Sequence, residues 1–142
     1  MMQLLHPPGW TAPKGYANGV AAEGRLVVVA GQIGWDAEQR IVSDELAAQT
    51  EQALANIAAV LAEADALPQH VVRMTWYVTD KRAYLAQTEA IGAAYRRVMG
   101  RHFPAMTLVE VAGLLEDGAL VEIEATAVVP AAPPARGSQP LL

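Results

Sequence analysis

The sequence predicts a single α+β domain in which two helices cover one face of a mixed β-sheet. Two segments carry apolar residues at spacings of three and four, which is typical of a helix with one buried stripe. Five segments rich in β-branched and apolar residues alternate with them in the order ββαβαββ. Because each helix has one apolar stripe and the strands between them need crossover connections, we expect both helices on the same sheet face.

The composition favours an oligomer and argues against nucleic acid or a membrane as partner. The 142 residues suffice for one domain with its own core, and 53% of them are hydrophobic against 18% charged. The net charge of −5 gives no attraction to phosphate backbones or anionic lipid. The chain has no cysteine and no apolar run approaching the roughly 20 residues of a membrane span. We therefore expect a cytoplasmic homo-oligomer without disulfides or a thiolate nucleophile.

The domain is expected to span residues 16–129, between a flexible leader and a flexible tail. Residues 1–15 contain three prolines and two glycines, and residues 130–142 are rich in proline and small residues without periodicity. At the start of the domain, residues 16–22 and 25–30 have the composition of strands. Glu23-Gly24 between them supplies the positive-φ residue of a tight hairpin.

The helices are predicted from their caps and breakers. The first helix should begin near Ser43, whose hydroxyl is suited to capping, and end before Pro68. A strand over 71–78 follows and is expected to be central. The second helix should begin after a capping Asp80 and end at Gly100, which sits where a left-handed residue is needed.

The last two strands, 105–111 and 120–129, are expected to pair as an antiparallel hairpin. Both are apolar on two sides, whereas the helices cover only one face of the sheet. We therefore expect a second subunit to cover the other face, with Val121 and Ile123 in the interface.

Three glutamates on these strands are the best candidates for acid or base chemistry. Glu122 and Glu124 share one strand face because side chains alternate with a period of two, and Glu110 on the other strand is expected to join them. Partial burial would raise the pKa of one carboxyl and make it a usable general acid or base. The alternative is a solvent-facing strand without a chemical role.

Other chemistries find little support. His6, His70 and His102 are widely spaced, so we expect locally hydrogen-bonded side chains and no metal site. Gly31 and Gly34 follow a strand but lack the third glycine of a phosphate-binding loop. The sequence has no Gly-x-Ser-x-Gly elbow, which argues against an acyl-enzyme mechanism.

Five short motifs occur in a characteristic order and spacing. They are Val-Val-Ala-Gly-Gln at 28–32, Tyr-Val-Thr-Asp at 77–80, Phe-Pro-Ala at 103–105, Val-Glu-Val at 109–111 and Gly-Ala-Leu-Val-Glu-Ile-Glu-Ala at 118–125. In this order they resemble the reactive intermediate deaminase family, also called RidA, YjgF or L-PSP. The resemblance runs over about residues 16–129, nearly the whole expected domain.

The resemblance implies a chorismate-mutase-like α+β fold that assembles as a homotrimer around a central β-barrel, with clefts for a small-molecule ligand between subunits. Active members hydrolyse enamines and imines derived from amino acids, releasing ammonia and a 2-keto acid, without a cofactor. In such members an arginine holds the substrate carboxylate and a glutamate positions water. Carried over one residue at a time, the resemblance matches Glu122 to the glutamate, Tyr16 and Tyr95 to the aromatic lining and Gly31 to the glycine near the pocket.

Three polar positions of that pocket are lost in this chain. Met106 stands at the arginine position, Ala30 at a serine and Gly92 at an asparagine. A methionine cannot donate the paired hydrogen bonds that hold a carboxylate, so we expect a more apolar pocket and weak activity toward imino acids. Arg73 and Arg101 are other cations of the chain considered for the carboxylate, although their spacing does not favour either.

The expected function is therefore hydrolysis of a small imine, enamine or related metabolite that lacks the amino-acid carboxylate, with Glu122 as acid and base. Two alternatives stay open. A trimer that binds a small ligand or another protein without catalysis would keep the same cleft, because a fold does not fix a function. An endoribonuclease would need phosphate contacts that the acidic balance of the chain disfavours.

Overall fold

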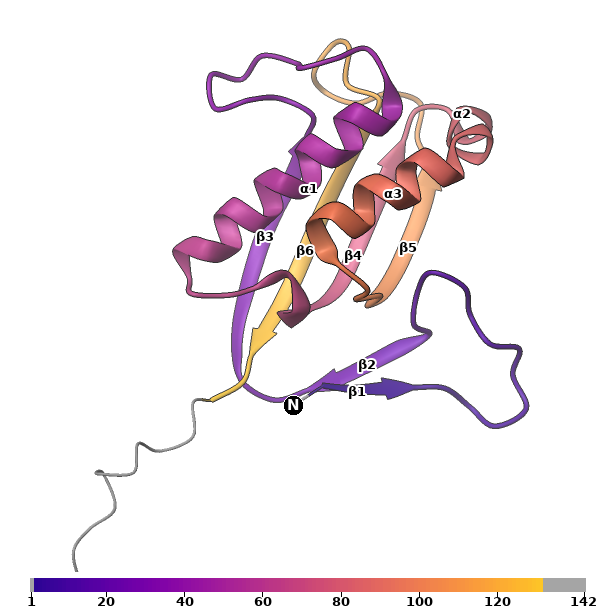
Figure 1. Cartoon of the computed structure of the whole chain (residues 1–142), viewed down its shortest axis with the longest axis vertical. Helices are drawn as coiled ribbons and strands as arrows, with labels where there is room; N and C mark the ends of the chain where they lie inside the picture. Colours follow the sequence, from indigo (N-terminus) through magenta and orange to yellow (C-terminus); the bar gives the residue numbers. More distant parts are fainter. Residues whose placement is uncertain (1, 132–142) are drawn as a thin grey trace, which may run out of the picture.

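The computed structural model describes residues 2–131 and has a four-stranded sheet with helices on one face (Figure 1). The strand order is β3-β6-β4-β5, with β4 and β5 parallel and the other neighbours antiparallel. The bounds of these strands are β3 (Arg25–Ile33), β4 (Val71–Val78), β5 (Ala105–Glu110) and β6 (Val121–Val129). The predicted α+β fold with a mixed sheet is confirmed.

The first helix, α1 (Leu46–Glu63), forms where its apolar stripe predicts it. Leu54, Ile57 and Leu61 of this stripe are fully buried, and α1 packs on β3, β6 and the second long helix. Burying each such side chain contributes about 1.5–3 kcal/mol to stability. The predicted Ser43 cap does not form, because its hydroxyl accepts the N–H of Glu45 at 3.0 Å, ahead of the first turn. A short helix, η1 (Pro68–His70), then leads into β4.

The second predicted helix is interrupted at Gln87. It forms two helices, α2 (Lys81–Ala86) and α3 (Thr88–Met99). Asp80 caps α2 as predicted, and its carboxylate accepts the backbone N–H groups of Arg82 and Ala83 at 2.9 and 3.1 Å. Gly100 ends α3 with a φ of 67°, also as predicted.

The last two strands do not pair with each other, so the prediction of a terminal hairpin is wrong. β4 lies between β5 and β6, and β5 reaches its parallel position beside β4 through the crossover formed by α2 and α3. β6 instead pairs with both β3 and β4. This interior position satisfies the backbone groups on both edges of β6.

The N-terminal residues also differ from the prediction. A strand, β1 (Met2–Leu5), pairs antiparallel with β2 (Gly19–Ala22) in a separate two-stranded sheet, so the expected leader is not free of regular structure. The expected hairpin between residues 16–22 and 25–30 is absent, because β3 pairs with β6 instead. Gly24, with a φ of 147°, allows this turn, since a Cβ there would lie 2.1 Å from the carbonyl oxygen of Val129. The expected tail lies outside the described residues from residue 132 onward.

The sheet face opposite the helices is uncovered by the described part of the chain. We call it the open face; it includes Val28 of β3, which is 68% exposed, and the half-buried Glu122 and Glu124 of β6. Val121 and Ile123 point the other way and are fully buried in the core under the helices. The prediction that these two residues form a subunit interface is therefore wrong.

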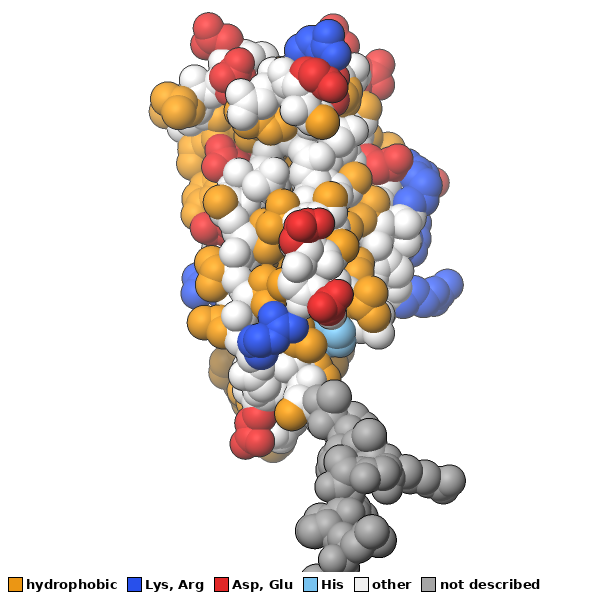
Figure 2. Space-filling model, turned by 90° about the vertical axis from the view of Figure 1, so that its left-hand side faces the viewer, with side chains coloured by type: hydrophobic (Ala, Val, Ile, Leu, Met, Phe, Trp, Pro, Cys, Tyr) orange, Lys and Arg blue, Asp and Glu red, His pale blue; other side chains and the backbone are white. Residues whose placement is uncertain are grey.

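The outer surface carries charges of both signs. Figure 2 shows acidic and basic side chains scattered among hydrophobic ones on the side of the molecule formed by α1 and β3.

Within residues 2–131, none of the helices has both the length and the apolar character needed to cross a bilayer.

Candidate functional site

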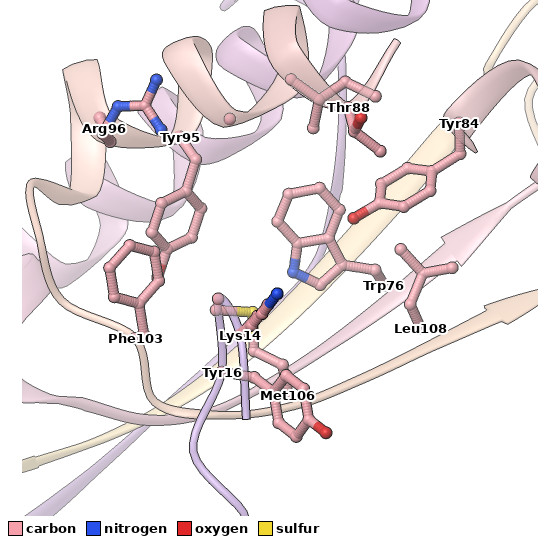
Figure 3. Close-up of a pocket in the computed structure, with 13 residues that line it drawn as sticks. Lys14, Tyr16, Trp76, Tyr84, Thr88, Tyr95, Arg96, Phe103, Met106 and Leu108 are labelled. Atoms are coloured by element: carbon pink, nitrogen blue, oxygen red, sulfur yellow. The ribbon is translucent and has the colours of Figure 1, made fainter. Parts of the chain in front are cut away.

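A cavity of about 580 Å³ opens beside α3, where the helices leave the β4–β5 edge of the sheet partly uncovered (Figure 3). Strand alternation turns Trp76 of β4 and Met106 and Leu108 of β5 toward the helices and into this cavity. The remaining lining residues come from α2, α3 and two loops: Lys14, Gly15, Tyr16, Tyr84, Thr88, Ile91, Gly92, Tyr95, Arg96 and Phe103. We call this space the aromatic cavity.

Aromatic rings form much of its wall. Tyr95 stacks on Phe103 with ring centroids 5.4 Å apart, and Trp76 lies 6.3 Å from Tyr95 and 6.5 Å from Tyr84. The hydroxyl of Tyr95 donates a hydrogen bond to the backbone carbonyl of His102, which fixes the ring. Burial raises the pKa of both Tyr84 and Tyr95, so both phenols stay neutral at physiological pH.

The N-terminal segment closes one side of the aromatic cavity. Ala17 bridges to Ala105 at the start of β5, and its N–H donates to the carbonyl of Pro104 at 3.0 Å. This anchor holds Tyr16 and Lys14 at the cavity. No sequence pattern points to Lys14, because the proline-rich segment before residue 16 predicts a flexible leader.

Arg96 is a second cation that sequence reasoning missed. It follows Gly92 by four residues on α3, so the two lie on the same helix face, and its guanidinium nitrogen is 3.3 Å from where a Cβ on Gly92 would be. In the described residues neither Arg96 nor Lys14 forms an ion pair. The two arginines that the sequence suggested lie elsewhere: Arg73 lines hollows next to the open face and Arg101 lines a neighbouring hollow.

Glu122 lies on the open face directly against Gly31. A Cβ at position 31 would be 2.0 Å from the nearer carboxylate oxygen of Glu122, so any larger residue there would force this carboxylate to move. The register of β3 against β6 is irregular between Val29 and Gln32, which places Ala30 and Gly31 within a bulge.

The expected cluster of three carboxylates contains only two. Tyr77 donates a hydrogen bond of 2.5 Å to Glu124 on the open face, and this bond, together with desolvation, raises the pKa of Tyr77. Glu110 lies on the opposite face, where its carboxylate accepts the backbone N–H of Lys81 at 2.8 Å, at the start of α2. The prediction that Glu110 joins Glu122 and Glu124 is therefore wrong, because the register of β5 pairs Glu110 with the core residue Val78 and turns it to the helix side of the sheet.

The histidines take no part in the aromatic cavity. His6, His70 and His102 each make a hydrogen bond with a backbone group, at 3.0, 3.0 and 2.7 Å. Such local bonds agree with the interpretation that they are structural side chains.

Comparison with known proteins decides the family. The family model described as Endoribonuclease L-PSP matches residues 10–129. The chain belongs to this family, RidA. A relative from Salmonella typhimurium, named 2-iminobutanoate/2-iminopropanoate deaminase, is 34% identical over 116 residues, which cover 80% of this chain and 86% of that protein. A RutC family protein of Synechocystis is 32% identical over 136 residues, covering 91% and 98%.

Solved structures agree with this assignment to the RidA family. The Rid family protein YyfB of Yersinia pestis superposes with a TM-score of 0.79 at 34% identity, covering 90% of this chain and 98% of that chain. RidA of Psychrobacter gives a TM-score of 0.64 at 28% identity, covering 84% and 92%.

Within this RidA fold the residues suggested by the sequence divide into two groups. Four of them line the aromatic cavity: Tyr16, Gly92, Tyr95 and Met106. Glu122, Gly31 and Ala30 lie apart from that lining, at the contact between β3 and β6. One chain therefore does not bring the two groups around a single cavity.

Proposed function

We propose that this RidA family member hydrolyses the C=N bond of a small imine or enamine that carries no carboxylate beside that bond. The observation that supports this most is the thioether of Met106 in an aromatic cavity, at the position where a carboxylate-binding arginine is expected. The relative from Salmonella is named for substrates that do carry a carboxylate. Replacing two charge-assisted hydrogen bonds by a methionine would remove the main means of holding such a substrate.

The site is completed by assembly in this proposal. The open face of one subunit packs against its neighbours in a homotrimer around a central β-barrel, and Glu122 of one chain faces the aromatic cavity of the next. The separation of Glu122 from the cavity within one chain supports this arrangement. The open face also combines exposed apolar side chains, such as Val28, with the hydrogen-bonding groups of a partner-facing surface.

Glu122 would act as both base and acid. Its carboxylate takes a proton from water as the oxygen attacks the carbon of the C=N bond, and the bond electrons go to nitrogen, which is protonated. The resulting amino alcohol then loses ammonia as the carbonyl forms, so that imine and water give a carbonyl compound and ammonia. Gly31 leaves the carboxylate of Glu122 room beside the backbone of β3.

Replacing Glu122 by glutamine tests this role. Glu122→Gln keeps the shape of the side chain but cannot transfer the proton, so ammonia release from a carboxylate-free aryl imine, generated in place by an amine oxidase, should fall by about 10²–10⁴-fold. Glu124→Gln is the matched control, because Glu124 lies on the same face of β6 and is held by Tyr77. Equal turnover by wild type and Glu122→Gln, with both assembled alike, would show that Glu122 is structural.

A trimer that binds a small ligand without catalysis is the second candidate. It is favoured by the aromatic cavity itself, which contains no carboxylate among its described lining residues. If no imine is hydrolysed faster than in buffer while a ligand binds the cavity, this second function replaces the first.

A further inference from the structure

The indole N–H of Trp76 is an unsatisfied donor. Trp76 is only 4% exposed. Among the buried side-chain nitrogen and oxygen atoms of residues 2–131, Trp76 Nε1 alone lacks a hydrogen-bond partner. Buried donors are almost always paired, because losing a hydrogen bond to water without replacing it costs free energy. An unpaired donor in the wall of a cavity is available to an acceptor atom of a ligand, which would take the place of water there.

No described side chain around Trp76 accepts a hydrogen bond from its indole N–H. Figure 3 shows the indole nitrogen directed toward the part of the aromatic cavity where Lys14 and Met106 lie. The ammonium of Lys14 is only a donor and the thioether of Met106 is a weak acceptor. The hydroxyls of Tyr16, Tyr84 and Thr88 also line the cavity, but none of them accepts the indole N–H. Among the described lining residues there is no aspartate, glutamate, asparagine or glutamine.

The same walls restrict the shape of a ligand. The indole of Trp76 lies tilted by 31° to the ring of Tyr95, which stacks on Phe103, while Tyr84 meets the indole edge-on at 76°. Flat faces of this kind favour a flat ligand, which gains stacking as well as burial. Met106 and Leu108 add flexible apolar contacts rather than charge.

We propose that the aromatic cavity selects a planar, conjugated ligand whose acceptor atom receives the hydrogen bond of Trp76 Nε1. This inference rests on the proposed function for its site and names the substrate class: an aryl or otherwise conjugated imine. The nitrogen of such an imine and the carbonyl oxygen of its product are both acceptors. The imine nitrogen can therefore accept the N–H of Trp76 before hydrolysis, and the carbonyl oxygen can accept it afterwards.

Binding of three stable probes to the full chain tests the inference without any turnover. Benzamide is flat and has an acceptor, isopropylbenzene has the ring without a strong acceptor, and cyclohexanecarboxamide has the acceptor without a flat ring. We expect benzamide to bind more tightly than either of the others. In ¹⁵N–¹H spectra, benzamide should move the indole signal of Trp76 and leave those of Trp10 and Trp35 in place, since neither lines the cavity.

Two variants isolate the hydrogen bond. Trp76→Phe keeps an aromatic ring but removes the N–H, so benzamide should bind roughly tenfold more weakly while isopropylbenzene is unaffected. Trp10→Phe is the matched control and should bind all three probes like wild type, because Trp10 is exposed. If Trp76→Phe does not fold, the indole shift in the wild-type protein decides the question alone.

Several results would overturn the inference: an indole signal of Trp76 that stays fixed at saturating benzamide, equal affinity for benzamide and isopropylbenzene, or unchanged benzamide affinity in folded Trp76→Phe. None of the three probes has a C=N bond to hydrolyse, so the binding comparison needs no proton transfer by Glu122. Failure of hydrolysis therefore leaves this binding result intact, and failure of the binding result leaves hydrolysis standing.

Discussion

Met106 gives the aromatic cavity a different chemistry from a carboxylate clamp. Its side chain lies on the helix side of β5 among Trp76, Tyr95 and Phe103, where a thioether packs well and donates nothing. The cations of this cavity, Lys14 and Arg96, come from a loop and from α3 instead. Neither stands on β5, where an arginine would approach a substrate from the sheet.

Restoring the arginine alone should not restore activity toward imino acids. In Met106→Arg the guanidinium would enter a cavity that already holds Lys14 and Arg96. It would lack a polar partner at Gly92 and, in the proposed trimer, at Ala30 of the neighbouring subunit. We expect kcat/KM for ammonia release from iminopyruvate to stay within about tenfold of wild type. A variant that reaches the rate of an arginine-bearing family member would show that position 106 alone decides the substrate.

Much of the cavity could be predicted at the level of single residues, and some of it could not. The family resemblance points to Tyr16, Gly92, Tyr95 and Met106, and all four line one cavity. Trp76 lies within the strand predicted over 71–78, but its unpaired N–H depends on which side chains surround it. The sequence does not specify those neighbours.

At the scale of elements, local sequence patterns predicted the helices and strands well, but they did not predict which strands pair. The stripe of α1, the strand at 71–78, the Asp80 cap and Gly100 all depend on neighbours within a few residues, and the structure contains each of them. The positions of β5 and β6 depend on partners far along the chain. Nearness in sequence suggests a hairpin, but β5 follows a helical crossover from β4 and lies parallel to it, so that β4 separates β5 from β6.

Gln49 illustrates how a polar residue can join distant elements. It is fully buried on α1, where its side chain donates to the carbonyls of Ser43 and Gly118 and accepts the N–H of Leu120, each at 2.8 Å. These bonds tie the connection between β5 and β6 to the start of α1. Gly34 permits this packing, because a Cβ there would lie 2.6 Å from the Gln49 backbone.

At the scale of the whole molecule, we expect a trimer built through the open face. Val28 on that face is 68% exposed, so Val28→Asp should leave the single chain folded but place a charge in the interface. Light scattering should give a trimer for wild type and smaller species for Val28→Asp, with unchanged circular dichroism.

Leu85→Asp is the matched control, because Leu85 is 66% exposed on α2, away from the open face. This variant should remain a trimer. A wild-type protein that is a stable monomer at micromolar concentration, or a Val28→Asp variant that assembles like wild type, would contradict the proposed interface.

Ammonia release from two imines tests the central claim most directly. One is iminopyruvate and the other an aryl imine without a carboxylate, both generated freshly in the assay and compared with an arginine-bearing family member. Since a lost clamp of about 3 kcal/mol lowers kcat/KM roughly a hundredfold, wild type should be at least that much slower than this member on iminopyruvate. It should still accelerate hydrolysis of the aryl imine above the rate in buffer. Equal rates of the two proteins on iminopyruvate, without acceleration of the aryl imine, would contradict the account.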